Sequence, residues 1–312
     1  MKILVTGGAG FIGSHICHKL LELGHSVICL DNLSSGKVDN IRDVFHHPNF
    51  KFVHTDVLEL TDGSPELDVD AICHQAATGS VPKSIVNPEL YHKNNVDMFY
   101  HILELARNKK IKRFVYASSS SVYGDNTSLY KEESSIGNAL SPYAVSKQID
   151  ELYARVYAHC YGMETIGLRY FNVFGPKQNP YGDYAAVIPK FIVQLQDNVA
   201  PTINGDGTYS RDFTYVDNVV SANILALTTN NEHCFGQSFN IGAGTSTSIN
   251  ELYDLICNLV NSSLEPIYGP FRFGDIPKSL ASIDKASNYL DYHILVNIVD
   301  GLRNTVKYFT QK

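Results

Sequence analysis

The sequence lacks several features that mark specialised classes of protein. None of its six cysteines forms a Cys-x-x-Cys pair, and most of them lie in apolar runs such as 27–30. We therefore expect neither disulfides nor a metal site, but small buried thiols in a reducing compartment. Positive charge is also scarce, because the net charge is −7. This balance disfavours a nucleic-acid partner bound through a basic face.

Long apolar runs are missing as well. No segment approaches the roughly 18 consecutive apolar residues that a membrane span requires. Residues 3–6 are compatible with a strand and lead directly into glycines, which is not the pattern of a secretory signal. We therefore expect a cytoplasmic protein with no membrane partner.

The first half of the chain alternates short apolar runs with longer helix-like stretches, such as 11–23 and 96–109. The runs are apolar on both faces, as buried parallel strands are. This alternation predicts an α/β fold with a doubly wound parallel sheet of the Rossmann type. The expected strands are Lys2–Thr6, Ser26–Asp31, Phe50–Thr55, Asp70–His74, Arg113–Ser118 and Glu164–Tyr170.

The second half is richer in Gly and Pro clusters, with helical periods returning at 188–196, 216–227 and 249–260. This pattern of loops and helices predicts a smaller α/β domain that closes over the edge of the sheet. We expect residues 1–171 to bind a dinucleotide and residues 172–312 mainly to bind a substrate. The two domains are expected to interleave, with segments near 211–241 returning to the first.

A glycine cluster follows the first expected strand and opens the first expected helix. It reads GGAGFIG at 7–13, so that Gly7, Gly10 and Gly13 recur at intervals of three. Glycine allows a tight turn and a close approach of the backbone to a pyrophosphate, which the amino terminus of the helix then attracts. In this context the pattern predicts a dinucleotide site.

Acidic residues at the next strand ends refine this prediction. Asp31 ends the second expected strand, where a carboxylate accepts hydrogen bonds from ribose hydroxyls and repels a 2′-phosphate. Asp56 and Val57 follow the third and are expected to meet the adenine. These positions favour NAD over NADP as the cofactor.

A second cluster predicts the reacting centre. Tyr143 and Lys147 are four residues apart at the start of an expected helix, so they share one face. A tyrosine has an ordinary pKa of about 10, and a neighbouring Lys cation and nicotinamide ring would favour its phenolate. Tyr143 would then remove a proton from a substrate hydroxyl, while Ser119 or Ser120 would hydrogen-bond the same oxygen.

Taken together, these motifs resemble the extended short-chain dehydrogenase/reductase family, in particular its nucleotide-sugar 4-epimerases. The resemblance covers nearly the whole chain. It rests on GGAGFIG at 7–13, DNLSSG at 31–36, the serines before 122–124, SPYAVSK at 141–147, LRYFNVFGP at 168–176, SRDFTYVDNV at 210–219 and RFGDIPKS at 272–279.

The resemblance also implies roles for individual residues. For the cofactor it implies Gly7, Gly10, Phe11, Ile12, Gly13, Asp31, Asn32, Ser34, Gly36, Asp56, Val57, Ala76, Ala77, Asn95, Tyr143, Lys147 and Tyr170. For the nucleotide sugar it implies Ser80, Ser119, Ser120, Tyr143, Asn172, Ala186, Val187, Lys190, Tyr209, Arg211, Arg272, Asp275 and Ser279. Among these, Arg211 and Arg272 would grip the diphosphate, and Asp275 would hold a ribose hydroxyl.

The same comparison separates the chain from related lyases. Sugar 4,6-dehydratases carry an Asp-Glu pair after the catalytic Ser or Thr, and nucleotide-sugar decarboxylases carry a Glu there. Here that stretch is Ser120-Ser121, without a carboxylate. The resemblance therefore implies simple oxidation at C4, rotation of the 4-keto sugar and re-reduction on the opposite face, which inverts C4.

The preferred sugar is expected from two positions. Galactose-type epimerases have a bulky Tyr where this chain has Ser279, and a small side chain leaves room for an N-acetyl group. GSVP at 79–82 also resembles the sugar-facing loop of UDP-N-acetylglucosamine 4-epimerases. We therefore expect interconversion of UDP-GlcNAc and UDP-GalNAc. UDP-glucose/UDP-galactose and the uronic acid UDP-GlcNAcA remain alternative substrates.

Two other functions stay open at this point. One is a net NAD(P)-dependent reductase of a 4-keto nucleotide sugar, which would release its cofactor. The other is a non-catalytic NAD-sensing protein, which the presence of Ser119, Tyr143 and Lys147 disfavours. The resemblance further implies a homodimer through a four-helix bundle, built from the helices expected at 96–109 and 146–161.

Overall fold

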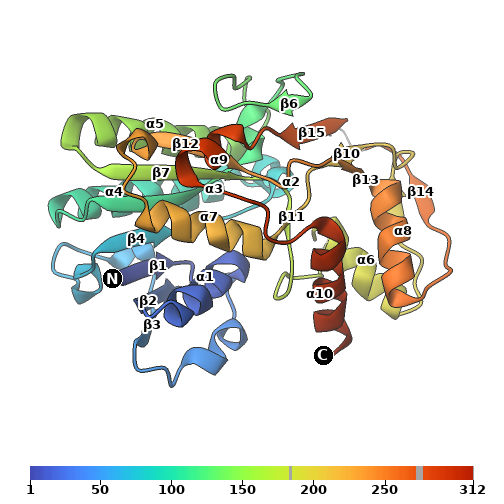
Figure 1. The fold of residues 1–312 in the computed structure, drawn as a ribbon, viewed down its shortest axis with the longest axis horizontal. Coiled ribbons are helices and arrows are strands. Elements are labelled where there is room, and N and C mark those ends of the chain that lie inside the picture. Colours follow the sequence, from blue (N-terminus) through green and yellow to red (C-terminus); the bar gives the residue numbers. More distant parts are fainter. Residues whose placement is uncertain (183–184, 272–276, 312) are drawn as a thin grey trace.

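A computed structural model describes residues 1–182, 185–271 and 277–311. Its main feature is a seven-stranded parallel sheet in the order β12-β7-β5-β4-β1-β2-β3 (Figure 1). The strands are β1 (Lys2–Thr6), β2 (Ser26–Asp31), β3 (Phe50–His54), β4 (Ala71–His74), β5 (Arg113–Ser119), β7 (Glu164–Tyr170) and β12 (Gln237–Ile241). The order reverses at β1, as in dinucleotide-binding folds, and the predicted doubly wound sheet is confirmed.

Helices cover both faces of this sheet. One face carries α1 (Phe11–Glu22) and α7 (Val216–Thr228), which pack on each other, and the other carries α4 (Met98–Asn108) and α5 (Pro142–Tyr161). Alternate residues of β1 show the consequence: Ile3 belongs to the core on the α1 side, and Leu4 to the core on the α4 side. Burial on both faces explains why the strands read as unbroken apolar runs.

The helix that follows β5 has clear signals at both ends. The Ser141 hydroxyl accepts a hydrogen bond from the backbone N–H of Ala144, and Pro142 occupies the first turn of α5. The helix ends at Gly162, whose φ of 65° is in the left-handed region. These caps hold Tyr143 in the first turn of α5, at the carboxyl end of the sheet.

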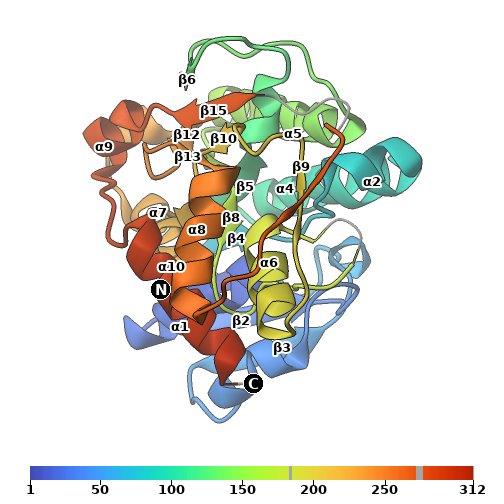
Figure 2. The same cartoon turned by 90° about the vertical axis from the view of Figure 1, so that its right-hand side faces the viewer.

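The smaller part of the molecule lies to the right in Figure 1 and faces the viewer in Figure 2. Its helices are α6 (Val187–Gln196), α8 (Ile249–Val260) and α10 (Ile298–Thr310), which pack on one another. A second sheet has the order β13-β10-β15-β6, and two-stranded sheets pair β11 with β8 and β14 with β9. The short strands are β6 (Tyr130–Lys131), β8 (Val173–Phe174), β9 (Thr202–Asn204), β10 (Ser210–Arg211), β11 (Thr214–Tyr215), β13 (Thr247–Ser248), β14 (Ile267–Gly269) and β15 (Lys278–Ala281).

The chain crosses between the two parts in both directions. β12 comes from the second half and forms an edge of the main sheet beside β7, whereas β6 comes from the first half and joins the smaller sheet. The remaining helices are α2 (Val81–Val86), α3 (Pro88–Tyr91) and α9 (Asp284–Leu290). Within the described part of the chain, no helix combines the length and apolarity needed to cross a bilayer.

Candidate active site

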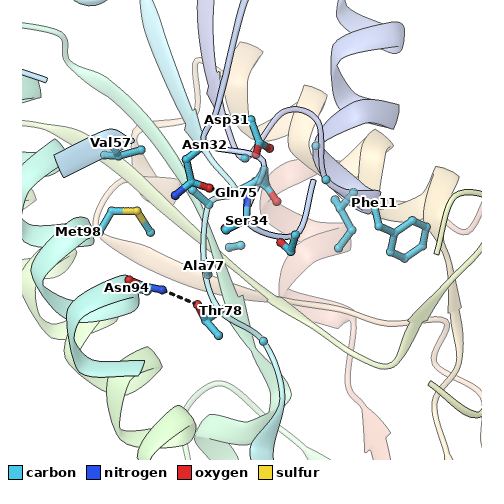
Figure 3. Close-up of a pocket in the computed structure, with 18 of the residues that line it drawn as sticks. Phe11, Asp31, Asn32, Ser34, Val57, Gln75, Ala77, Thr78, Asn94 and Met98 are labelled. Atoms are coloured by element: carbon cyan, nitrogen blue, oxygen red, sulfur yellow. Dashed lines mark hydrogen bonds between the residues drawn. The ribbon is translucent and has the colours of Figure 1, made fainter. Parts of the chain in front are cut away.

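A cavity of about 350 Å³ lies at the carboxyl ends of the central strands (Figure 3). At one end it is lined by Asp31 and Val57, and at the other by Tyr143 and Lys147. Among the described residues, the lining consists of Gly7, Gly10, Phe11, Ile12, Gly13, Leu30, Asp31, Asn32, Ser34, Ser35, Thr55, Asp56, Val57, Gln75, Ala76, Ala77, Thr78, Gly79, Asn94, Met98, Ala117, Ser118, Tyr143, Lys147 and Tyr170. The cavity thus joins the two site regions that the sequence predicted separately.

The glycine loop forms one wall of the cavity. Gly7 has a φ of 65°, and its N–H donates to the carbonyl of Leu30 on β2 over 2.8 Å. A side chain at Gly13 would collide with the backbone of Gly7 and Gly8. The loop therefore turns tightly onto the amino terminus of α1, which leaves backbone N–H groups available to a phosphate.

Asp31 is buried beside this loop. Its carboxylate accepts hydrogen bonds from the N–H of Ala9 at 3.0 Å and of Leu33 at 2.8 Å. Burial raises the pKa of Asp31, although both hydrogen bonds oppose that shift. Gly36 does not line the cavity. It packs against the Asp31 carboxylate, so we expect it to position Asp31 and not to contact a ligand.

Asn32 and Asp56 lie next to each other at the ends of β2 and β3. The Asn32 amide donates to one Asp56 carboxylate oxygen over 2.8 Å, and the other oxygen accepts from the N–H of Leu58. Both residues line the cavity together with Asp31 (Figure 3). The polar atoms at this end of the cavity suit a ribose and a base.

At the opposite end, α5 presents Tyr143 and Lys147. The Lys147 ammonium is buried and donates to the Ala117 carbonyl and to a carboxylate oxygen of Asp150, each at 3.0 Å. Burial alone would lower the pKa of Lys147, but the charges of Asp150 and Tyr143 outweigh it and the pKa is raised. Lys147 is therefore a permanent cation in the working pH range.

The ring of Tyr143 rests on a second tyrosine. Tyr91, at the end of α3, meets it edge to face, with ring centroids 6.2 Å apart. The Tyr91 hydroxyl donates to the carbonyl of Gly79 over 3.2 Å. Tyr91 thus connects Tyr143 to the loop that precedes α2, and sequence reasoning missed it because its spacing from Tyr143 carries no local signal.

Asn95 does not line the cavity but ties its walls together. It lies in a π-helical turn at His92–Asp97, and its amide group donates to the Ser146 hydroxyl at 3.0 Å and exchanges hydrogen bonds with the backbone of Thr78. The neighbouring Asn94 does line the cavity and donates to the Thr78 hydroxyl over 3.0 Å (Figure 3). Such turns are often found at functional sites.

The serines at and just after the end of β5 divide into two sets. Ser118 lines the cavity and donates to Glu151 at 2.5 Å. Ser119 and Ser120 lie outside the lining, and the Ser119 hydroxyl accepts hydrogen bonds from the N–H and hydroxyl of Ser121. Ser119 remains beside the cavity, because it pairs with the lining residue Tyr170 in the sheet.

Gln75 is a lining residue that the sequence prediction did not include. It accepts a hydrogen bond from the Tyr170 hydroxyl over 3.0 Å and donates to Asn223 of α7 over 3.1 Å. The feature of the sequence that could have indicated Gln75 is its position directly after β4, next to the predicted residues Ala76 and Ala77. Ser118, the next-to-last residue of β5, and Thr78, in the loop after β4, also line the cavity and were not predicted.

The expected substrate residues lie on short segments of the smaller part. Arg211 of β10 and Ser279 of β15 are direct partners in the parallel pair, and Tyr209 precedes β10. Asn172 donates to the Asp212 carbonyl over 3.1 Å. Ala186 caps α6, Val187 begins it, and Lys190 lies in its first turn. Arg272 and Asp275 lie outside the described residues.

Ser80 adopts a backbone conformation that is rare for a side-chain-bearing residue, with a φ of 133°. It caps α2 by accepting a hydrogen bond from the N–H of Lys83. It directly follows the lining residue Gly79. Strain of this kind is concentrated at functional sites, where the surrounding structure holds it in place.

The geometry fits a dinucleotide. The close-packed glycine loop leaves room for a pyrophosphate, the strand-end carboxylates suit a ribose, and the cavity then continues to a tyrosine beside a buried cation. No group of three or more His, Cys, Asp or Glu residues in the described ranges is placed to bind a metal ion.

Comparisons with known proteins agree with this geometry. The NAD dependent epimerase/dehydratase family model matches residues 3–242. A putative UDP-glucose 4-epimerase of Methanocaldococcus jannaschii is 40% identical over 309 residues, which cover 98% of this chain and 97% of that protein.

Two solved structures are similar over almost their whole length. UDP-N-acetylglucosamine 4-epimerase from Methanobrevibacter ruminantium, in complex with UDP-N-acetylmuramic acid, has a TM-score of 0.94 and 38% identity, covering 99% of this chain and 98% of that one. UDP-glucuronic acid 4-epimerase from Bacillus cereus, with UDP-glucuronic acid and NAD, has a TM-score of 0.92 and 32% identity, covering 100% and 99%. The chain therefore belongs to the NAD-dependent epimerase/dehydratase family, and NAD is its cofactor.

Proposed function

We propose that this protein is a UDP-sugar 4-epimerase that interconverts UDP-GlcNAc and UDP-GalNAc. The family and the cofactor support a reaction that passes through oxidation by NAD. The 4-epimerase names of the similar proteins support inversion at C4. Ser120-Ser121 supports the same assignment, because the acidic groups of related lyases are missing from that stretch.

In this proposal Tyr143 is the base that takes the proton from the C4 hydroxyl and later returns it. The buried Lys147 ammonium stabilises the phenolate that this role requires. Ser119 hydrogen-bonds the reacting oxygen. Bound NAD supplies a reversible hydride acceptor. The residues proposed to hold it are the glycine loop with Asp31 and Asn32 at one end, and Lys147 and Tyr170 at the other.

The remaining proposed roles concern the nucleotide part of the substrate. Arg211 would bind the diphosphate through its planar guanidinium group, and Asn172, Tyr209 and the start of α6 would surround the nucleotide. This arrangement would anchor the UDP group while the keto sugar turns.

The observation that carries the choice of sugar is the place of Ser279. It pairs directly with Arg211 in the smaller sheet, so a diphosphate held by Arg211 would bring the sugar near Ser279. A serine would leave space for the N-acetyl group at C2, whereas a tyrosine would fill it. The cavity-lining Gly79 and the strained Ser80 would form another part of the proposed sugar site.

The test is incubation with NAD and, separately, UDP-GlcNAc, UDP-Glc and UDP-GlcNAcA, followed by chromatographic separation of the epimers. We expect the highest kcat/KM for UDP-GlcNAc, and at least a tenfold loss of the ratio of UDP-GlcNAc to UDP-Glc turnover in Ser279→Tyr. The matched variant Ser279→Ala should keep the wild-type ratio. An unchanged ratio in Ser279→Tyr would overturn the choice of sugar. Stoichiometric accumulation of NADH together with a 4-keto sugar would identify net oxidation, the reverse reaction of a 4-keto reductase, in place of epimerisation.

We also propose that the enzyme is a homodimer. The solvent side of α5 exposes Val145, Leu152 and Val156, and Tyr153 of the same side stacks near Tyr100 of α4. An apolar stripe on a long helix is typical of an interface. A second copy would bury it in a four-helix bundle. Sedimentation equilibrium should give twice the monomer mass, and Leu152→Lys should reduce it.

A further inference from the structure

Asp150 lies on the buried side of α5, three residues after Lys147. One of its carboxylate oxygens accepts the hydrogen bond from the Lys147 ammonium at 3.0 Å, and neither residue is more than 3% exposed. The other oxygen is buried and accepts no hydrogen bond from any group in the described part of the chain. The carboxylate therefore has Lys147 as its main partner.

This arrangement costs folding free energy. A buried carboxylate with an unsatisfied oxygen is destabilising, and a buried ion pair recovers only part of the desolvation cost. Replacing Asp150 alone by an apolar residue would leave the buried Lys147 ammonium with only the Ala117 carbonyl as a partner. The acid at position 150 is therefore tied to the charge of Lys147.

The acid also affects the chemistry proposed for Lys147. The positive charge of Lys147 is what favours the Tyr143 phenolate. A carboxylate 3.0 Å from the same ammonium offsets part of that charge. The two effects act on Tyr143 in opposite directions.

The other groups near the pair contribute less net charge. Glu151, also on α5, is paired with Arg169 of β7 at 2.7 Å. His74 of β4 is neutral, because burial and the Lys147 charge lower its pKa to about 3. Tyr116 of β5 is neutral too, since burial and Glu151 raise its pKa.

The elements that pack on the other side of α5 carry Lys83, Glu89, Lys93 and Asp97, but these side chains are exposed, so solvent screens their charges. Tyr91 of α3 faces Tyr143, and Asn95 of the π-helical turn bonds to Ser146. Burial raises the pKa of Tyr91. Asp150 is thus the group best placed to offset Lys147.

We propose that Asp150 is a positioning residue that holds the Lys147 ammonium and weakens the positive charge it presents to Tyr143, thereby setting the pH at which Tyr143 becomes a base. This inference rests on the proposed roles of Tyr143 and Lys147.

The ionisation of Asp150 agrees with such a role. Burial raises the pKa of Asp150, although Lys147 opposes the shift. The ionised carboxylate offsets Lys147, whereas the protonated acid would leave the full Lys147 charge acting on Tyr143.

The test is the pH profile of kcat and kcat/KM for the wild type, Asp150→Asn and Asp150→Ala. Both variants remove the negative charge, so the phenolate becomes more stable and the acidic limb of the profile should move to lower pH by about one unit. The basic limb should move the same way, because Lys147 loses the carboxylate that raises its pKa. Asp254→Asn, the same change on the exposed side of α8, should leave both limbs in place.

A purely structural role would lower activity at every pH and leave the limbs where they are, and this result would overturn the proposal. Asp150→Asn keeps an oxygen that can accept a hydrogen bond from Lys147, so it should fold even if Asp150→Ala does not, and failure of Asp150→Asn to fold would contradict the proposal. Tyr143→Phe distinguishes an error in the catalytic role of Tyr143 from an error in the role of Asp150. If that variant keeps its turnover, the proposed catalytic role is wrong; if it is inactive while Asp150→Asn shows unmoved limbs, only the role of Asp150 is wrong.

Discussion

The two parts of the site are built in different ways. Six of the seven strands behind the cofactor cavity come from residues 2–170, and each delivers its lining residues as it ends. The smaller sheet instead pairs strands of two to four residues from near positions 130, 210, 247 and 278. The first part is therefore specified by local pattern, and the second by contacts between residues far apart in the sequence.

Asp212 shows how the second part is held together. Its carboxylate, fully buried after β10, accepts hydrogen bonds from the N–H of Ala243, Gly244 and Ala281. One side chain thus joins the end of β12, the end of β15 and the segment that carries Arg211. The strands behind the cofactor cavity are instead joined to one another by a continuous ladder of backbone hydrogen bonds.

The largest effect should follow from removing this connector. Asp212→Ala leaves three buried N–H groups without an acceptor, so we expect the free energy of unfolding to fall by about 3 kcal/mol. Urea unfolding followed by circular dichroism measures it. Asp254→Ala, on the exposed side of α8, should change it by less than about 0.5 kcal/mol. If Asp212→Ala were as stable as the wild type, the smaller part would not depend on this long-range connection, and the contrast between the two parts would be wrong.

The second-largest effect tests whether NAD binding depends on the close packing of the glycine loop. Gly13→Val places a side chain against the backbone of Gly7 and Gly8, so the loop has to move. We expect NAD affinity to fall about a hundredfold, or about 2.7 kcal/mol, in titration calorimetry. Gly63→Ala, where a Cβ meets only the Thr61 hydroxyl at 3.7 Å, should bind NAD normally. Normal binding by Gly13→Val would show that the loop does not need its close packing.

The smallest effect concerns the contact between the two parts. His15 of α1 hydrogen-bonds the Pro176 carbonyl over 3.0 Å, and burial lowers its pKa to about 4. Since the unfolded chain has the ordinary pKa of 6.5, the native state binds the proton less readily. Stability is therefore complete above pH 6.5 and is lost as the pH falls toward 4, by about 2 kcal/mol for this half-buried ring.

His15→Gln should remove that part of the acid sensitivity. The measurement is the free energy of unfolding between pH 7 and pH 4 for the wild type and the variant. His46→Gln, at an exposed position, serves as the control and should follow the wild type. Parallel curves for the wild type and His15→Gln would show that His15 is not the group responsible.

The sequence predicted the main sheet closely. The bounds of β1, β2 and β7 coincide with the predicted runs, and β5 extends one residue further than expected. β12 was not predicted as a strand, since Gln237–Ile241 has only three apolar-compatible positions and lies at the sheet edge. The helix expected from residue 96 begins at Met98 instead, because residues 92–97 form a π-helical turn, in which Asn95 hydrogen-bonds to Thr78.

By itself the sequence determined the parallel sheet, the glycine loop and the placing of Tyr143 and Lys147 on one helical face. These features depend on periodicity, turn chemistry and caps, which act over a few neighbouring residues. Tertiary structure alone decided that Ser279 lies beside Arg211, that Tyr91 supports Tyr143 and that Asp212 joins three segments. Two-residue strands and single buried hydrogen bonds have no local propensity to reveal them, because their stability comes from partners far away in the chain.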